Sequence, residues 1–283
     1  MSNCSIVALI CLNMRLLIRY FPVLFFLIAV FAVDQYAQPN KGAVAVTPPF
    51  LVGETLTYEG KINKIINGIA VADLTFTVAK APESENYLVK AAARSKGTLL
   101  KLFRFSFLQE FDSTIGNRDF RILKTTKHDV QKDRVRDSEA VFDYRQQRVT
   151  YIETDPKEPM RPPRTIASEI ENDTTHDLIS GLYSLRMMPL TVGKSFEIAV
   201  SDSGLVYNIP VKVTSRERQK SIFGNVWCFR VEPNIFGPGR MIEREGSMVV
   251  WITDDARRLP IRSQVNSPIG RIEIKLKTAK NLK

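Results

Sequence analysis

Apolar and polar residues alternate along most of the chain from about residue 50 onward. Leu56 and Tyr58, for example, alternate with threonine and glutamate, and the same period of two recurs to the end of the sequence. This period is typical of β-strands in an antiparallel sheet with one face in water. The runs that follow it are 55–59, 72–78, 87–93, 103–112, 120–127, 135–144, 148–154, 196–200, 205–214, 227–232, 247–253, 259–266 and 272–276.

Residues 174–193, TTHDLISGLYSLRMMPLTVG, interrupt the alternation. Thr174 or Thr175 is placed to cap the start of a helix, and a proline and a glycine stand at its end. We therefore predict a central helix near residues 175–188. Its apolar face is formed by residues at helical spacing: Leu178, Ile179, Leu182 and Leu185.

About thirteen strands are too many for one flat sheet. We therefore expect an all-β, mainly antiparallel domain over residues 49–283, built as a strongly curved sheet that is closed or half-closed into a barrel. The helix would lie across its mouth. A proline-rich loop at 155–164 and the helix separate the strands, so a construction from two β halves, 49–154 and 190–283, stays open.

The N-terminus has the layout of a secretory signal peptide, with Arg15 and Arg19 before an uncharged run at 21–33. We predict a signal peptide at 1–37, whose true start is Met14 in one interpretation, followed by a linker at 38–48. An uncleaved anchor is the alternative, but the run is shorter than the roughly 20 apolar residues that span a bilayer. The expected location is the periplasm or cell envelope.

Charge and cysteine content narrow the function classes. The net charge is +10, from 40 basic and 30 acidic residues, but the basic residues are scattered along the chain and form no dense cluster. That distribution argues against nucleic-acid binding and leaves membrane contact to the signal segment or to surface charge. Of the three cysteines, only Cys228 follows the predicted cleavage site, so no internal disulfide is expected and Cys228 is interpreted as a small buried hydrophobe.

The sequence offers few residues for catalysis or metal binding. Its two histidines, His128 and His176, are far apart, so we expect no metal site and no cofactor. Asp254 and Asp255, beside two arginines, form the densest charged cluster. Paired carboxylates suit acid–base catalysis or a cation, whereas the simpler interpretation is a turn whose carboxylates bond backbone N–H groups and the arginines.

A row of aromatic residues is the most suggestive feature for binding: Phe103, Phe105, Phe107 and Phe111. These side chains either pack into the core against the helix or line an apolar ligand cavity together with Leu178 and Leu182. Periodicity does not separate the two interpretations.

Three motifs resemble the exported bacterial family catalogued as domain of unknown function 3108. They are PFLVGETLTY at 49–58, DLISGLYSLR at 177–186 and WITDDARRLP at 251–260, and the resemblance extends over about 49–278. It implies a periplasmic or envelope location. The β-rich plan is more loosely similar to periplasmic lipoprotein and lipid carriers of the Lol type, which is fold-level analogy.

Seven positions of the chain follow the family pattern: Asp177, Tyr183, Arg186, Asp254, Asp255, Arg258 and Pro260. We expect Arg186 and Arg258 to pair with the aspartates and to hold the helix against the sheet, which would make these positions structural. The predicted function is a non-enzymatic binding module for a lipid, an acyl chain or a lipoprotein. The alternatives are an envelope scaffold that binds a protein or an anionic polymer, and an envelope enzyme that uses Asp254 and Asp255.

Overall fold

The computed structural model describes residues 46–63, 68–98, 101, 104–171, 174–268 and 270–283. The predicted signal peptide at 1–37, residues 38–45 of the predicted linker, and Phe103 lie outside these residues. The compact unit that contains the described residues is Val44–Lys283.

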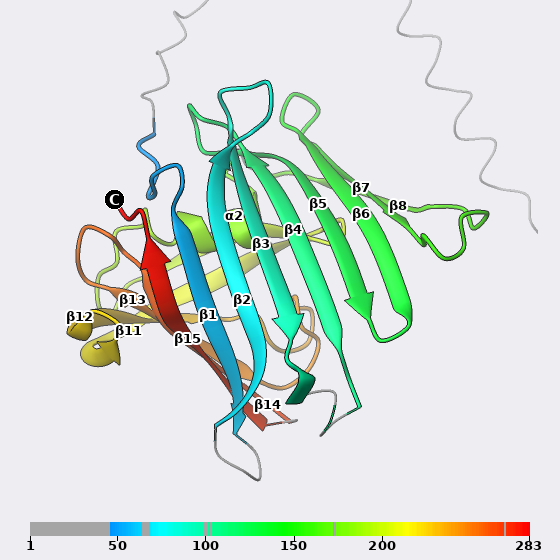
Figure 1. Ribbon diagram of the computed structural model, residues 1–283. Helices are drawn as coiled ribbons and strands as arrows, with labels where there is room; N and C mark the ends of the chain where they lie inside the picture. Colours follow the sequence, from blue (N-terminus) through cyan, green and yellow to red (C-terminus); the bar gives the residue numbers. More distant parts are fainter. Residues whose placement is uncertain (1–45, 64–67, 99–100, 102–103, 172–173, 269) are drawn as a thin grey trace, which may run out of the picture. The chain divides into compact units, whose positions relative to one another are not determined.

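The described residues form a single 15-stranded sheet. The order in space is β8-β7-β6-β5-β4-β3-β2-β1-β15-β14-β13-β12-β11-β10-β9 (Figure 1). The strands are β1 (Thr55–Asn63), β2 (Ile69–Lys80), β3 (Tyr87–Ser95), β4 (Phe107–Ile115), β5 (Ile122–Gln131), β6 (Arg134–Asp143), β7 (Arg148–Thr154), β8 (Arg164–Glu169), β9 (His176–Asp177), β10 (Ser195–Asp202), β11 (Leu205–Ser221), β12 (Gly224–Pro233), β13 (Ser247–Thr253), β14 (Pro260–Ser267) and β15 (Gly270–Lys280).

Pairing between β1 and β15 joins the two ends of the domain in one sheet, with Thr55 opposite Lys280 and Asn63 opposite Arg271. The first arm of the sheet, β1–β8, and the second arm, β9–β15, therefore continue into each other. The two predicted halves of the sequence correspond to these arms rather than to separate sheets. Neighbours along each arm pair antiparallel, except that β9 pairs parallel with β10.

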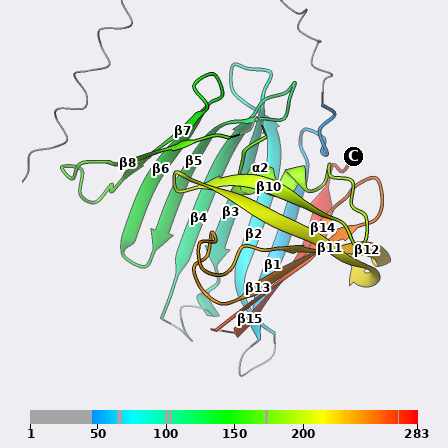
Figure 2. The ribbon, with the colours of Figure 1, turned by 180° about the vertical axis from the view of Figure 1, so that it is seen from behind.

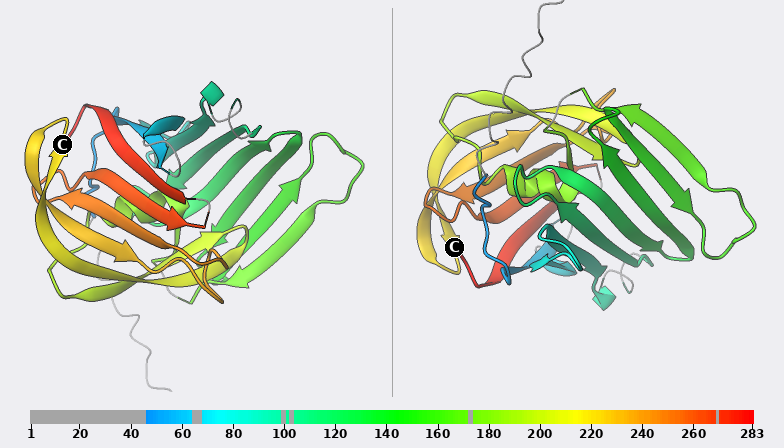
Figure 3. Two further views of the ribbon diagram at one scale, coloured as in Figure 1. Left: turned by 90° about the horizontal axis from the view of Figure 1, so that it is seen from below. Right: turned by 90° about the horizontal axis from the view of Figure 1, so that it is seen from above.

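The sheet curves so strongly that its two arms face each other. In end-on views the yellow-to-red strands lie opposite the green ones, and the view from behind agrees (Figures 2 and 3). The prediction of a curved, mainly antiparallel sheet is confirmed, and the sheet is not closed. Near the opening, the Ser168 hydroxyl of β8 donates to the carbonyl of Gly204 at 2.6 Å. A Cβ atom added to Gly204, which has φ +83°, would lie only 2.7 Å from the Cβ of Tyr151, so a larger residue would push the arms apart.

The predicted central helix is present but shorter than 175–188. Helix α2 spans Leu178–Ser184, because residues 176–177 pair with β10 as a strand instead. Asp177, and neither of the two threonines predicted for this role, is the N-cap, and its carboxylate accepts from the backbone N–H of Ser180 at 2.6 Å. The helix contacts β3 and β4 of the first arm and β10 of the second. Within the described residues, no helix has the length and apolar character needed to cross a bilayer.

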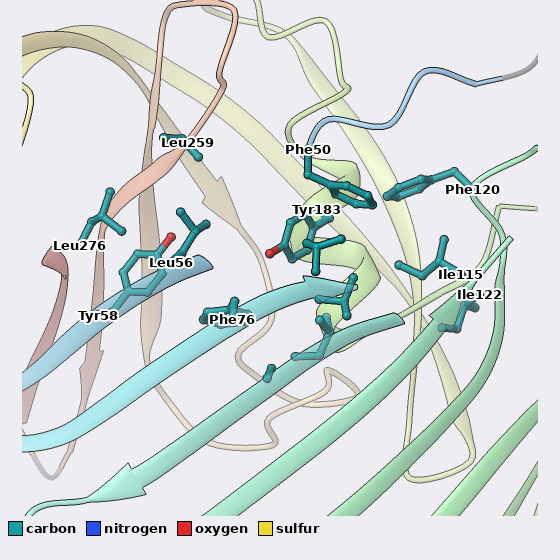
Figure 4. Packing of buried hydrophobic residues seen from close by; sticks show 14 of the residues in the cluster. Phe50, Leu56, Tyr58, Phe76, Ile115, Phe120, Ile122, Tyr183, Leu259 and Leu276 are labelled. Atoms are coloured by element: carbon teal, nitrogen blue, oxygen red, sulfur yellow. The ribbon is translucent and has the colours of Figure 1, made fainter. Parts of the chain in front are cut away.

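Aromatic rings fill the space between α2 and the first arm. Phe50 lies at the centre, with ring centroids 5.4 Å from Tyr183 and 6.0 Å from Phe120 (Figure 4). A second apolar cluster, which includes Leu185, lies between the end of the helix and β10–β13. Cys228 is fully buried, and burial raises the pKa of its thiol to about 12, which keeps it neutral and unreactive.

Candidate functional site

A buried ion pair lies just after α2. The guanidinium of Arg186 donates to both carboxylate oxygens of Glu54, at 2.6 and 3.0 Å, and both side chains are essentially inaccessible to solvent. The same guanidinium donates to the backbone carbonyls of Pro49 at 2.7 Å and Arg257 at 3.2 Å. The expectation that Arg186 pairs with an aspartate is wrong, because its carboxylate partner is Glu54, 132 residues away in sequence.

Asp177 joins the two arms of the sheet at the other end of α2. Its backbone pairs with Ser201 of β10 in the second arm. One carboxylate oxygen accepts hydrogen bonds from the hydroxyls of Ser113 in β4 and Thr125 in β5, both in the first arm. The other oxygen caps the helix at Ser180. This buried carboxylate is satisfied by neutral donors and acts as a structural junction.

The acidic pair near the end of the chain forms a surface turn. Asp254 lies 2.6 Å from Arg216 and 3.6 Å from Arg258, and Asp255 lies 2.5 Å from Arg257. Burial disfavours the charged form of Asp255, but hydrogen bonds from Arg257 and the Thr253 hydroxyl outweigh it and hold the pKa of Asp255 below its ordinary value. Both carboxylates are therefore engaged by arginines.

The turn leads directly into the family-pattern proline. Leu259 donates its backbone N–H to the Thr253 hydroxyl at 2.9 Å, which closes the turn. Pro260, which follows, is buried and begins β14.

The predicted aromatic lining is only partly assembled. Phe111 and Leu178 line one cavity together, but its volume is about 30 Å³. A water molecule occupies roughly 30 Å³ of liquid, so this space is too small for an acyl chain. Phe105 and Phe107 pack against each other with centroids 6.2 Å apart, and Leu182 packs against both core clusters.

A larger apolar cleft, of about 270 Å³, lies on another side of α2. It is lined by Val46, Asp119, Phe120, Arg121, Thr174, His176, Ser184, Met187, Met188, Glu197 and Ile198. These residues come from the segment before β1, from the β4–β5 turn, from both ends of the helical segment and from β10. The sequence interpretation missed this cleft, although the adjacent methionines after the helix were a usable signal, because methionine suits adaptable binding surfaces.

A family model described as "Protein of unknown function (DUF3108)" matches residues 55–277. The chain belongs to this family. The resemblance predicted from the three motifs is thus confirmed. In the DUF3108 chain the motifs meet at one point, since Arg186 of the second motif contacts Glu54 of the first and the carbonyl of Arg257 in the third.

One solved structure shows the same fold. A β-barrel-like protein of domain of unknown function DUF1849 from Brucella abortus matches the DUF3108 chain with a TM-score of 0.53 and 9% identity, over 82% of this chain and 98% of that one. A Bacteroides fragilis protein with a YmcC-like fold, inferred to be exported, matches with a TM-score of 0.30 and 13% identity, over 83% and 99% respectively. No curated protein matches the chain.

His176 supplies the cleft of this DUF3108 protein with a buried imidazole. The side chain is 7% exposed, and its Nδ1 has no hydrogen-bond partner within the part of the chain that the structure describes. Burial lowers the pKa of His176 to about 4, and the neighbouring Asp177 carboxylate offsets this only in part. The imidazole is therefore neutral at pH 7 and offers one nitrogen to a bound molecule.

This burial predicts an acid-sensitive fold. The unfolded chain takes up the His176 proton near pH 6.5, while the native chain takes it up only near pH 4. Between these values the unfolded state binds more protons, so stability falls as the pH drops, by about 2–3 kcal/mol across the window. Urea unfolding at a series of pH values measures this loss.

The variant His176→Gln is expected to flatten that window. The matched control is His128→Gln, because His128 lies on the outer face of β5 beside Asp137 and is half exposed. If His128→Gln removed the dependence and His176→Gln did not, the acid sensitivity would belong to the other histidine.

Proposed function

We propose that the chain is a non-enzymatic binding module of the periplasm or cell envelope, which holds an apolar ligand in the cleft beside α2. The ligand class is a lipid, an acyl chain or the lipid tail of a lipoprotein. The observation that carries the proposal is the 270 Å³ cleft, whose lining is mainly apolar and contains a single buried imidazole.

The size and chemistry of the cleft support a chain-like ligand. Small-molecule sites usually measure about 300–1,000 Å³, so this cleft fits a short acyl chain or the end of a longer one. Met187 and Met188 border it, and their unbranched side chains adapt to chains of different shape. The neutral nitrogen of His176 suits a ligand with one hydroxyl or protonated carboxyl group.

The fold supports ligand binding, and the N-terminal segment supports a location in the periplasm or cell envelope. Curved antiparallel sheets of this kind can hold one small ligand. The basic and then apolar start of the chain is the pattern of an export signal. We propose no catalytic role, because Asp254 and Asp255 are held in ion pairs with arginines.

Blocking the cleft should weaken binding. The variant Met188→Trp adds an indole at a partly exposed residue of the cleft lining. The affinity for a fluorescent fatty acid is expected to fall roughly tenfold or more, which corresponds to about 1.4 kcal/mol. Titration of delipidated protein with the fatty acid measures the affinity. The matched control is Val192→Trp, since Val192 is 46% exposed and outside the cleft lining.

Two outcomes would overturn the proposal. One is equal affinity for the fatty acid in Met188→Trp and Val192→Trp, which would place any binding elsewhere. The other is the absence of saturable binding by the unmodified chain together with no lipid in an organic extract of the purified protein.

A scaffold function is the second candidate. The outer face of β2–β7 has hollows of about 430 and 530 Å³, which share Thr126 and His128 in their linings. The scaffold function would be favoured if a protein or polymer bound to the chain in a salt-sensitive way. Substitutions on this face should then remove that binding and leave fatty-acid binding in the cleft unchanged.

A further inference from the structure

The β11–β12 hairpin ends in a surface that combines cations with exposed apolar side chains. Its turn lies between Ser221 and Gly224, at the far left of the ribbon and away from β8 (Figure 1). We name this surface the hairpin tip and define it by its exposed residues: Arg216, Arg218, Lys220, Ile222 and Trp227.

The indole of Trp227 is the centre of the hairpin tip. It is 42% exposed, which is unusual for so large an apolar ring. The guanidinium carbons of Arg216 and Arg218 lie 4.4 and 5.3 Å from the centroid of the ring. Arg218 stands directly opposite Trp227 across the strand pair, so the two side chains share one face of the hairpin. Ile222, at the turn itself, is 44% exposed.

The charge at the hairpin tip is only partly neutralised by the protein. Arg216 is paired with Asp254 at 2.6 Å. Arg218 and Lys220, in contrast, form no ion pair with any carboxylate in the described residues. Two uncompensated cations thus flank an exposed tryptophan and an exposed isoleucine. The remaining positive charge favours an anionic partner. The exposed apolar side chains favour a partner that has an apolar region directly behind its charged surface.

We propose that the hairpin tip docks the protein on a lipid surface that carries anionic headgroups. A membrane interface offers both features that the tip requires. Tryptophan is enriched at the headgroup level, where its ring is buried and its N–H remains hydrated. Arginine and lysine near the surface are attracted to anionic headgroups, and Ile222 at the turn inserts among the first acyl carbons. The inference does not depend on the cleft beside α2.

Tryptophan fluorescence of the full chain tests the docking directly. The chain has two tryptophans, and Trp251 is buried with its indole N–H bonded to Glu217. The probe is a vesicle of equal parts phosphatidylcholine and phosphatidylglycerol, with and without bromine on the acyl chains. We expect a blue shift and quenching by bromine in the unmodified chain. Both should be lost in Trp227→Phe, which keeps only the buried indole.

Charge variants separate the hairpin tip from the N-terminal apolar segment, which every variant shares. The double variant Arg218→Gln/Lys220→Gln should weaken the vesicle-dependent blue shift, with a half-saturating lipid concentration that rises roughly fivefold for each cation removed. The matched control is Arg145→Gln/Arg148→Gln, which removes the same charge from two exposed residues, one in the β6–β7 turn and one at the start of β7. That control should titrate like the unmodified chain.

Three results would overturn the proposal. The first is a Trp227 signal that is equal for pure phosphatidylcholine vesicles and anionic ones. The second is an equal loss in the two double variants, which would indicate attraction through net charge alone. The third is saturation of the same Trp227 response by soluble polyphosphate without bromine quenching in vesicles, which would assign the hairpin tip to free anions.

Discussion

Replacing Arg186 by methionine is expected to lower the free energy of unfolding by about 3–5 kcal/mol, because it leaves the Glu54 carboxylate buried without a counter-charge. The loss extends beyond one ion pair. The backbone carbonyls of Pro49 and Arg257 also lose their donor. The segment before β1, the end of α2 and the turn before β14 would therefore loosen together. Urea unfolding followed by circular dichroism measures the change.

The stability of Arg186→Met is compared with that of a control variant and of a double variant. The control is Lys124→Met, which breaks a pair with Glu139 of similar length, 2.6 Å, between side chains that are both nearly half exposed. Such surface pairs contribute about 0–1 kcal/mol. The double variant Glu54→Leu/Arg186→Met should be more stable than Arg186→Met alone, since it removes the unpaired charge. If Arg186→Met cost no more than Lys124→Met, the buried pair would not stabilise the fold.

The strands could be predicted because their signal is local. Alternation along β1 reports which side chains face the interior, and that information needs no knowledge of the partner strand. The long curved sheet then follows from the number of strands. The helix was predicted too long because its start depends on pairing with a distant strand, which leaves no local signal. Residues 176–177 have no local strand pattern and become β9 only through pairing with β10.

The partner of Arg186 could not be read from the sequence. Asp177 is nine positions away and looked suitable, yet its carboxylate is occupied by hydroxyls and by the helix cap. Glu54 becomes the partner only after β1 and the helix have been brought together by the sheet. The three family motifs can be recognised as sequence, but their convergence on one guanidinium is a property of the fold.

The cleft beside α2 escaped prediction because no local pattern marks it. Phe120, His176 and Ile198 each belong to a different segment, and only the curvature of the sheet brings them together. The aromatic row has a clear local pattern, but that pattern does not reveal the role of its side chains. Alternating phenylalanines indicate an inward face, but whether an inward side chain packs or lines a cavity depends on what stands opposite. Phe111 borders a cavity, but one of only about 30 Å³.

Replacing Asp177 by alanine is expected to lower the free energy of unfolding by roughly 4 kcal/mol, the sum of a lost helix cap of about 1 kcal/mol and two charge-assisted hydrogen bonds of about 1.5 kcal/mol each. Ser113 is fully buried, so its hydroxyl would lose its acceptor where water does not replace it. Thr125, which is partly buried, would lose less.

The variant Asp177→Asn divides the two contributions. The amide oxygen can still accept from the backbone of Ser180 and preserve the cap. Its nitrogen is a donor, however, and it would face the donor hydroxyls of Ser113 and Thr125. We expect a cost of about 2 kcal/mol for this variant. The control is Asp133→Ala in the exposed β5–β6 turn, which should change stability by no more than about 0.5 kcal/mol.

The size of the Asp177→Ala effect decides whether α2 holds the two arms of the sheet together. A loss near 1 kcal/mol would mean that the carboxylate only caps the helix. A loss near 4 kcal/mol would mean that the bonds to β4 and β5 fasten the first arm to a residue whose backbone is paired with the second. In the latter case hydrogen exchange should also quicken in β9 and β10, because their pairing would lose its anchor on the facing arm.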